Sequence, residues 1–191
     1  ILEDIQSGRE IEEDMVTTTL DSVDRIRRLI QRLLEYNAGH ATSRDAMQPL
    51  DVNEVAGAVQ ELTRKTLQQT QKTIILDLKP VPQVIANRDA LTQVFINLAL
   101  NAAEAMNPGG TLTISTRKAK DKVEISFMDT GHGIPPEMID RVFDPFVTTK
   151  ANGSGLGLFV SYGIIEGHHG TMKVNSTPDK GTTFTISLPV I

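Results

Sequence analysis

Apolar residues recur along the chain with two different periods, and the period changes near residue 46. Before that point, residues 11–37 carry an apolar side chain at every third or fourth position, with mostly polar positions between. These apolar positions are Val16, Leu20, Val23, Ile26, Ile30 and Leu33. The spacing predicts one amphipathic helix, which at ~1.5 Å per residue would be roughly 40 Å long. A lone helix cannot bury such a stripe, so it packs on its own domain or in a helical bundle or coiled-coil dimer. The length and the polar linker at 37–49 favour the bundle or dimer.

After residue 46 the pattern predicts three helices. The first follows Asp51, which we expect to cap it together with Glu54 in a capping box. Its apolar face is Val52, Val55, Val59 and Leu62. The second covers 89–106 and ends at the Asn-Pro-Gly-Gly turn of 107–110. The third begins after the loop-rich stretch 129–157 and ends near Glu166.

Alternating apolar residues predict strands between and after these helices. The alternating sets are Ile74, Leu76 and Leu78; Leu112 and Ile114; Val123, Ile125 and Phe127; Met172 and Val174; Phe184, Ile186 and Leu188. The segment 118–122 is a hairpin turn by this pattern. The fold class expected is α+β, a two-layer α/β sandwich with one mixed or antiparallel sheet and helices on one face. We expect two domains, the helical region 1–45 and the sandwich 46–191.

Composition narrows the function without naming it. The chain has 191 residues, 39% of them hydrophobic and 23% charged, which suits a folded core. With 19 basic and 24 acidic residues the net charge is −5, which argues against nucleic acid as the main partner. The absence of cysteine excludes disulfides and thiolate catalysis. No apolar run is long enough for a membrane span and no secretory signal opens the chain, so we expect no direct membrane contact. Because the chain starts at Ile1, we expect it to be part of a longer protein.

The helix at 89–106 carries a second, polar stripe beside its apolar face. The stripe contains Gln93, Asn97, Asn101 and Glu104, which stack because they are three or four residues apart. It is either an ordinary solvated face or a row of oxygen ligands, since an amide oxygen suits a hard cation such as Mg²⁺.

Two glycine-rich segments come later. The segment DTGHGIP at 129–135 follows a strand directly. It is either a simple tight turn or a binding loop in which the carboxylate of Asp129 accepts a hydrogen bond from an exocyclic amine such as that of adenine. GSGLGL at 153–158 opens the third helix, where free N–H groups can meet a phosphate. It is neither a Walker A loop nor a dinucleotide-binding fingerprint. Just upstream, Thr149 and Lys150 supply a hydroxyl group and a cation.

These segments in this order resemble the ATP-binding catalytic domain of two-component sensor histidine kinases, which has the Bergerat fold. NLALNA at 97–102 resembles the N box, DTGHGIP the G1 box, FDPF at 143–146 the F box and GSGLGL the G2 box. The resemblance covers about residues 46–191. More weakly, residues 24–34 resemble the second helix of the family's dimerisation and phosphoacceptor hairpin.

The resemblance implies a role for each matching residue. Catalytic roles fall on Asn97, Asn101 and Lys150, with Asn101 as the Mg²⁺ ligand and Asn97 supporting the phosphates or the water shell of the metal. Asp129 would bind the adenine amino group, and residues 143–155 would form a lid over ATP. The ATP-binding set implied is Asn97, Asn101, Asp129, Gly131, Gly133, Thr149, Lys150, Gly153, Gly155, Leu156, Gly157 and Thr182.

The implied reaction is phosphoryl transfer from Mg²⁺-bound ATP to a histidine, then to an aspartate on the receiver domain of a response regulator. The implied assembly is a homodimer through the N-terminal helix, in the cytoplasm, with a parent protein that can be membrane-anchored. One departure is clear, because none of His40, His132, His168 and His169 matches the phosphoacceptor box. Either that histidine precedes this sequence, or the protein transfers elsewhere or not at all.

Three other functions share the fold. A gyrase-, chaperone- or mismatch-repair-type ATPase would need a glutamate as general base where Asn97 stands, since an asparagine cannot activate water. An anti-sigma-type serine kinase fits poorly with the long preceding helix. A pseudokinase that binds nucleotide and signals by conformation is disfavoured by the intact boxes.

Overall fold

The structure is a computed structural model that describes residues 47–150 and 153–191. The predicted long helix at 11–37 and the predicted dimer contact lie outside the described residues. The helices are α2 (Val52–Gln69), α3 (Arg88–Ala105), α4 (Pro136–Ile139) and α5 (Gly157–Gly167). The strands are β1 (Gln48–Leu50), β2 (Thr73–Leu78), β3 (Val84–Ala86), β4 (Thr111–Ala119), β5 (Lys122–Asp129), β6 (Thr171–Thr177) and β7 (Gly181–Pro189).

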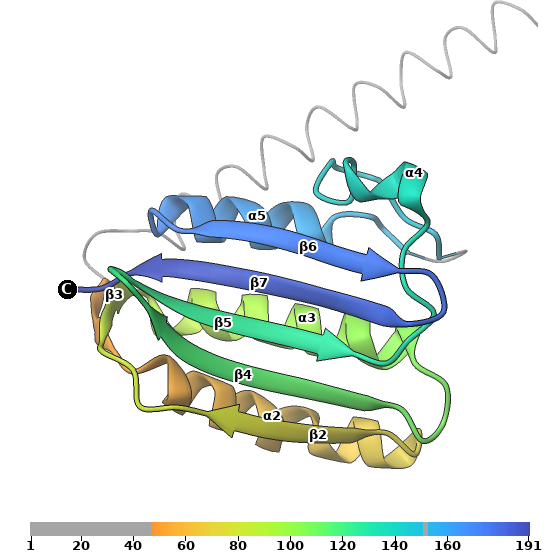
Figure 1. Cartoon of the computed structure of the whole chain (residues 1–191), viewed down its shortest axis with the longest axis horizontal. Helices are drawn as coiled ribbons and strands as arrows, with labels where there is room; N and C mark the ends of the chain where they lie inside the picture. Colours follow the sequence, from red (N-terminus) through yellow and green to blue (C-terminus); the bar gives the residue numbers. More distant parts are fainter. Residues whose placement is uncertain (1–46, 151–152) are drawn as a thin grey trace, which may run out of the picture. The chain divides into compact units, whose positions relative to one another are not determined.

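One five-stranded sheet carries the fold, with the strand order β2-β4-β5-β7-β6. The β2–β4 pair is parallel and the other pairs are antiparallel. Helices α2, α3 and α5 lie on one face of this sheet, and α3 packs between the other two (Figure 1). The predicted α+β two-layer sandwich with a mixed sheet is therefore confirmed.

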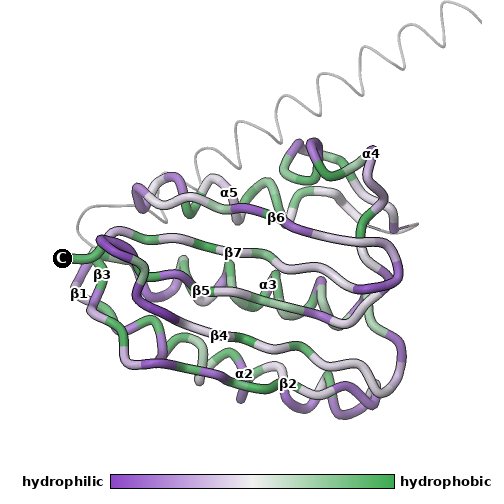
Figure 2. Tube along the Cα trace, in the orientation of Figure 1, coloured by the Kyte–Doolittle hydropathy of each residue, from purple (hydrophilic) through white to green (hydrophobic). Residues whose placement is uncertain are grey.

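The core lies between the sheet and the three helices. In β4, β5 and β7 every second residue is buried, as the alternating pattern predicts, while the residues between face away from the helices. Phe127 of β5 meets Phe95 of α3 edge to face, with ring centroids 5.1 Å apart. Figure 2 shows hydrophobic residues recurring at intervals along the helices, and the buried residues of α2 and α3 recur at helical spacing. This packing fixes α3, and with it the polar stripe that α3 presents beside the core.

Helix α2 corrects two details of the sequence prediction. Leu62 is 63% exposed, and Thr63 takes the buried position instead. Thr63 follows Val59 by four residues and donates its hydroxyl to the carbonyl of Val59 at 2.7 Å, so a polar side chain can be buried there. Ten residues separate Leu62 from Val52, which rotates Leu62 off the apolar stripe of a 3.6-residue helix.

The capping box predicted at the start of α2 is half right. Asp51 caps the helix by accepting a hydrogen bond from the backbone N–H of Asn53 at 2.9 Å. The Glu54 side chain does not return to the cap, because it forms an ion pair with Arg88 of α3. A tertiary charge partner outcompetes the local backbone donor at this exposed position.

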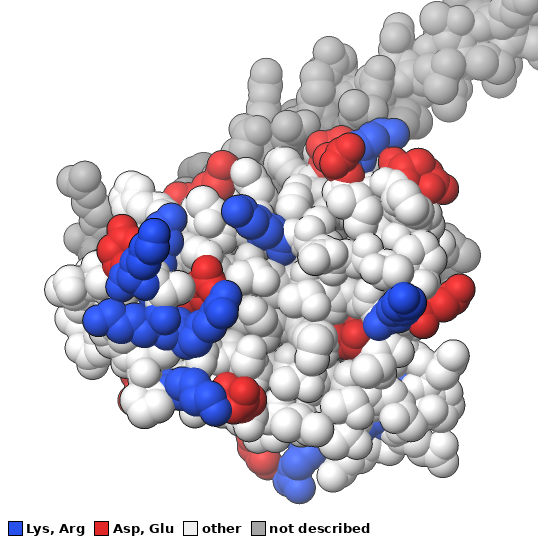
Figure 3. All heavy atoms as spheres, viewed as in Figure 1, with Lys and Arg blue, Asp and Glu red and all other residues white. Residues whose placement is uncertain are grey.

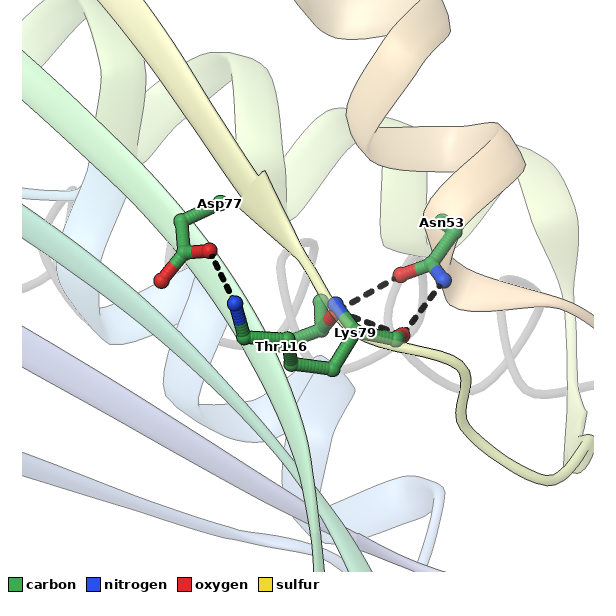
Figure 4. Close-up of polar contacts among 4 residues, drawn as sticks. All are labelled: Asn53, Asp77, Lys79 and Thr116. Carbon is green, nitrogen blue, oxygen red and sulfur yellow. Dashed lines mark hydrogen bonds and ion pairs between the residues drawn. The ribbon is translucent and has the colours of Figure 1, made fainter.

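Polar contacts fix the start of α2 to the end of β2 and to β4 (Figure 4). Asn53 donates to the carbonyl of Lys79 at 2.9 Å and accepts the hydroxyl proton of Thr116 at 2.7 Å. Lys79 in turn pairs with Asp77 at 2.7 Å. These contacts satisfy backbone groups where β2 leaves the sheet at an edge.

Three short elements were missed by the sequence prediction. Strands β1 and β3 form a separate antiparallel pair of three residues each, too short to show alternation. Helix α4 has four residues within the stretch predicted as loop. Such elements depend on tertiary contacts more than on local periodicity.

No helix of residues 47–150 or 153–191 covers the other face of the sheet (Figure 1). On the side drawn in Figure 3, Lys and Arg gather at the end of the sheet where the β4–β5 hairpin lies, and most of the remaining face is uncharged. The hairpin contributes Arg117, Lys118, Lys120 and Lys122. Within the described part of the chain, every helix is too short or too polar to cross a membrane.

Candidate nucleotide-binding site

A cavity of about 650 Å³ opens beside α3, between the end of β5, the segment that includes α4, and the start of α5. Its size lies within the range of small-molecule sites. Ten of the twelve predicted ATP-binding residues line it: Asn97, Asn101, Asp129, Gly133, Thr149, Lys150, Gly153, Gly155, Gly157 and Thr182. Gly131 and Leu156 are not in its lining. The structure thus brings residues far apart in the sequence to one cavity, while their binding roles stay predictions.

The polar stripe of α3 forms one wall of the cavity. Asn97 donates its amide N–H to the hydroxyl of Ser161 in α5, with an Nδ2···Oγ distance of 2.9 Å. Asn101, one turn later, donates its own amide to Oδ1 of Asn97 at 3.4 Å. Gln93 is exposed and does not line the cavity. The predicted stripe is therefore only partly in the site, from Asn97 onward.

Lys150 lies against this wall. Its ammonium donates to Oδ1 of Asn101 at 2.8 Å and forms an ion pair with Glu104. Two acceptor oxygens one turn apart on α3 thus hold the Lys150 ammonium at the cavity. Amide and carboxylate oxygens also suit Mg²⁺, so the residues present fit the metal that the resemblance implies. Among the described residues no cluster of three or more histidines and carboxylates could hold a metal by itself.

Asp129 also lines the cavity, as the last residue of β5. Its Oδ1 accepts hydrogen bonds from the backbone N–H groups of Gly131 at 2.8 Å and Thr182 at 3.2 Å. Burial raises the pKa of this carboxyl, and the two backbone donors and nearby His132 offset part of that rise. Within residues 47–150 and 153–191, Oδ2 accepts no hydrogen bond, which leaves it available to an amine in the cavity.

The glycines after Asp129 let the chain turn closely around it. A Cβ on Gly131 would lie 2.6 Å from the carbonyl oxygen of Ala105, so a side chain is excluded there. Gly133 has φ of +73° and packs against the backbone of Thr177. Gly131 therefore acts by holding Asp129 through its N–H and does not itself line the cavity.

A serine in β6 ties this loop to the neighbouring hairpin. Ser176 accepts the backbone N–H of Ile134 at 2.8 Å and shares a hydrogen bond of 2.9 Å with the hydroxyl of Thr182. Thr182 is buried, and its backbone N–H is one of the two that hold Asp129. Loop and hairpin together thus fix the carboxylate in one position.

The FDPF segment anchors the stretch between α4 and α5. The ring of Phe143 packs on Tyr162 of α5 and Phe184 of β7, with centroid distances of 5.1 and 6.3 Å. The backbone N–H of Phe146 donates to the carbonyl of Gly155 at 3.0 Å, which joins the FDPF and GSGLGL segments. Gly155 has φ of +67° and lies against the backbone of Phe146. The predicted lid at 143–155 includes residues 151–152, which lie outside the described residues.

Helix α5 begins at the cavity with Gly157. A Cβ there would lie 2.5 Å from Oδ1 of Asn97, so the glycine lets the helix start approach the α3 wall. The first-turn N–H groups of a helix are unpaired within it and attract anions. Leu156 is the N-cap residue, and its N–H is 3.3 Å from the hydroxyl of Ser154. A phosphate group in the cavity could thus accept hydrogen bonds from the backbone N–H groups of α5 and from Lys150.

The site also contains residues that the sequence analysis did not assign. An apolar wall is made by Leu100, Ile134, Met138, Val142, Leu158 and Phe184. Ile134 and Leu158 stand inside the motif segments, which could have indicated them. Met138 and Val142 follow no period, and Ser161 is 64 positions from its partner Asn97, so no sequence pattern pointed to them. His132 also lines the cavity. His168 is buried as the C-cap residue of α5 and does not line it.

Comparison with known proteins identifies the family of the chain. Residues 86–191 match the family described as histidine kinase-, DNA gyrase B- and HSP90-like ATPase. The chain is 37% identical over 171 residues to sensor histidine kinase ZraS of Salmonella typhi, covering 88% of this chain and 36% of ZraS. It is 33% identical over 187 residues to signal transduction histidine-protein kinase AtoS of Escherichia coli (strain K12), covering 97% of this chain and 30% of AtoS. The chain thus spans about a third of the length of these relatives.

Solved structures give the same fold. The catalytic domain of histidine kinase ThkA superposes with a TM-score of 0.69 at 30% identity, over 75% of this chain and 95% of that domain. Full-length ShkA in complex with AMPPNP gives 0.74 at 26% identity, over 93% of this chain and 38% of ShkA. ThkA in complex with the response regulator TrrA gives 0.68 at 26% identity, over 90% of this chain and 49% of the ThkA chain.

The family match covers more than half of the chain, including all four motif segments. Among the family's branches, the relatives are named sensor histidine kinases, and Asn97 stands where the ATPases need a general base. The chain belongs to the family of histidine kinase-, DNA gyrase B- and HSP90-like ATPases, and its described part is the ATP-binding catalytic domain of a sensor histidine kinase.

Proposed function

We propose that this domain binds ATP with Mg²⁺ and positions the γ-phosphoryl group for transfer to a histidine on a helical hairpin. The observation that carries the proposal is that one cavity is lined both by Asp129 and by the contact between Asn101 and Lys150. One oxygen of Asp129 is held by two backbone donors while the other accepts no hydrogen bond from the described residues, and the Lys150 ammonium lies 2.8 Å from Oδ1 of Asn101. An adenine amine needs a hydrogen-bond acceptor such as Asp129. A triphosphate with its Mg²⁺ needs a cationic group such as Lys150 and an oxygen ligand such as Asn101.

In the transfer, an imidazole nitrogen forms a bond to the γ-phosphorus while the bond from phosphorus to the β,γ-bridging oxygen breaks and ADP leaves. The protein contributes positioning and charge stabilisation and takes no covalent part. Bound Mg²⁺ supplies neutralisation of phosphate charge, with Asn101 as its protein ligand and Asn97 behind it. Lys150 and the N–H groups at the start of α5 receive the phosphate oxygens. The part of the cavity that the phosphates occupy is shaped by Thr149, Gly153, Gly155 and Gly157.

We further propose the partners and the setting of the reaction. The complex of ThkA with TrrA supports a response regulator as the downstream acceptor. The AMPPNP complex of ShkA supports an adenine nucleotide as the ligand. The protein forms a homodimer through residues 1–45, so that the hairpin of a partner subunit can present the histidine. It works in the cytoplasm, because ATP is a cytoplasmic substrate.

Two measurements test the proposal. Calorimetry should give micromolar to millimolar binding of ATP with Mg²⁺ and much weaker binding of GTP, whose O6 carbonyl cannot donate to Asp129. Incubation with γ-labelled ATP and a separately supplied phosphoacceptor hairpin should label the hairpin with an acid-labile, alkali-stable product. No uptake of adenine nucleotide at millimolar concentration would refute nucleotide binding. Binding without any labelled hairpin would favour the pseudokinase alternative.

A further inference from the structure

Three polar side chains and a lysine form a directional chain of hydrogen bonds from the core of the domain to the cavity. Asn97 donates to Ser161, Asn101 donates to Asn97, and Lys150 donates to Asn101. In each amide the nitrogen faces inward along the chain and the oxygen faces outward. The chain therefore ends at the cavity with Oδ1 of Asn101, the oxygen that holds the ammonium.

The polarity of this chain matters because the two ends of an asparagine amide have opposite chemistry. Oδ1 accepts hydrogen bonds and ligates cations, whereas Nδ2 donates and repels them. If Asn97 were reversed, its nitrogen would face Asn101, and Asn101 would have to present its own nitrogen to the cavity. A site for a hard cation requires the orientation that the structure shows.

Ser161 stands at the inner end, where the direction is set. It is buried, with 2% of its surface exposed, in the middle of α5. A serine within a helix can give its hydroxyl proton to the carbonyl one turn earlier, which leaves its lone pairs for an incoming N–H group. The start of α5 adds to this preference, because Oδ1 of Asn97 faces Gly157 at the positive end of the helix.

We infer that Ser161 is a positioning residue that orients the amides of Asn97 and Asn101, so that Asn101 presents its oxygen to the metal of Mg²⁺-bound ATP. This inference rests on the proposed function and extends it to a residue that touches neither nucleotide nor metal. Groups behind a metal ligand commonly act in this way, and their loss lowers metal affinity about ten- to a hundredfold.

The test compares Ser161→Ala, Ser161→Thr and Gly163→Ala, all in α5. A Cβ added at Gly163 would meet no atom within 4 Å, so its alanine variant controls for substitution in this helix. ATP affinity is measured by calorimetry for each variant with Mg²⁺ and with EDTA. We expect Ser161→Ala to lower the affinity about tenfold with Mg²⁺ and less than about twofold with EDTA. Ser161→Thr, which keeps the hydroxyl, should recover most of the loss.

A second readout follows the amides without metal or nucleotide. In the NMR spectrum of the free protein, the side-chain N–H₂ signals of Asn97 should exchange slowly in the wild type and in Ser161→Thr, and faster in Ser161→Ala. Equal losses with Mg²⁺ and with EDTA would show that Ser161 only supports the fold, and unchanged affinity would remove it from the site; either overturns the inference. Wild-type protein that binds no ATP would instead overturn the proposed function, and this inference with it.

Discussion

The ammonium of Lys150 donates a hydrogen bond to Oδ1 of Asn101, with an N···O distance of 2.8 Å. The same ammonium forms an ion pair with Glu104, one turn further along α3. Lys150 therefore has two oxygen partners on α3. Any triphosphate that recruits Lys150 has to compete with the carboxylate of Glu104.

Replacing Glu104 by glutamine should raise the affinity for ATP. The change removes a negative charge beside the phosphate path and weakens the competing contact with Lys150. Both side chains are partly exposed, at 59% for Glu104 and 42% for Lys150, so the pair contributes at most about 1 kcal/mol, or about fivefold in Kd. The gain should shrink as salt is added. Lys150→Ala should lower the affinity instead.

The matched control is Glu124→Gln, which removes a carboxylate that pairs with Arg117 in the β4–β5 hairpin. Because Glu124 does not line the cavity, its glutamine variant should bind ATP as the wild type does. If Glu104→Gln and Glu124→Gln behave alike, Glu104 has no part in the path of the phosphates.

Replacing Asn101 by alanine should remove most of the Mg²⁺ dependence of ATP binding. Calorimetry with Mg²⁺ should show a loss of at least about tenfold, and binding in EDTA should change little. The fold should persist, because alanine is the better helix former. Gln93→Ala on the same helix is the control, since Gln93 is exposed and lies outside the cavity. A variant that keeps the wild-type response to Mg²⁺ would remove Asn101 as the ligand.

Replacing Asp129 by asparagine should separate base recognition from phosphate binding. The amide oxygen can still accept the N–H groups of Gly131 and Thr182, but an N–H₂ replaces the oxygen proposed for adenine. Loss of a hydrogen bond to a charged group costs roughly 1.5–3 kcal/mol, about ten- to a hundredfold in Kd. Binding of inorganic triphosphate should be unchanged, and equal losses for both ligands would contradict the assignment.

The same variant should not lower the thermal midpoint of the free protein. Burial raises the pKa of Asp129, which means that the folded state disfavours its charged form. The neutral amide avoids that desolvation at neutral pH. As the pH falls through the raised pKa, the folded state takes up a proton, so the wild type gains stability relative to Asp129→Asn. A fall in the thermal midpoint at neutral pH would show that the charge itself stabilises the loop.

Most of the fold could be predicted because its long elements bury one face. Helix α3 and strands β4 and β5 repeat their apolar residues over enough turns or alternations to fix the type of element. The predicted turn at 118–122 is too long, because β4 continues to Ala119 and β5 begins at Lys122. At the end of the α2 stripe the prediction places Leu62 in the core by its hydrophobicity, although helical spacing puts Thr63 there. The burial of Thr63 could not be predicted, because it depends on the hydrogen bond from its hydroxyl to the carbonyl of Val59. The short strands β1 and β3 have no period to detect.

The site divides in the same way. Asn101 and Asp129 stand in compact motifs, so sequence could indicate them. The contacts that orient them connect distant parts of the chain, as in Asn97 with Ser161 or Asp129 with Thr182. Such pairs form because α5 and β7 pack against the rest of the domain. This packing cannot be predicted from the local sequence.

Two glycines of α5 should respond oppositely to alanine. At Gly157 the new Cβ would lie 2.5 Å from Oδ1 of Asn97, so the Asn97 side chain must move and leave Ser161. We expect Gly157→Ala to lower the affinity for Mg²⁺-bound ATP by about tenfold or more. At Gly163 the Cβ meets open space, and helix propensity should stabilise Gly163→Ala by about 0.5–1 kcal/mol with unchanged binding. Unchanged nucleotide affinity in Gly157→Ala would mean that the position of the Asn97 amide is unimportant.

The stability of the domain should fall in mild acid because of His168. Its side chain is 2% exposed and joins two helices: Nδ1 lies 2.7 Å from the carbonyl of Ile164 in α5, and Nε2 accepts the backbone N–H of Asn87 at 3.0 Å. Nε2 can accept only when it carries no proton, so the folded state requires the neutral ring. Burial lowers the pKa of His168 below its ordinary value of 6.5. In the unfolded chain the ring protonates near 6.5, so the unfolded state binds more protons below that pH.

The free energy of unfolding should therefore be nearly constant above about pH 7 and decline as the pH falls below 6.5, until the folded ring also protonates. Urea titrations at several pH values measure this slope. In His168→Gln the contribution of His168 to the slope should vanish, because glutamine does not titrate. His169→Asn is the comparison variant: His169 is adjacent but exposed, and asparagine tolerates its positive φ of 55°. Its charge contributes only the smallest part of the lowered pKa of His168, so the slope should change less than in His168→Gln. Because Asn87 caps α3, the helix that carries Asn97 and Asn101, ATP binding in the wild type should weaken relative to His168→Gln only at the lower pH at which the folded ring itself protonates and loses the N–H of Asn87. An unchanged stability slope in His168→Gln would place the acid sensitivity in other groups and leave His168 as a packing residue alone.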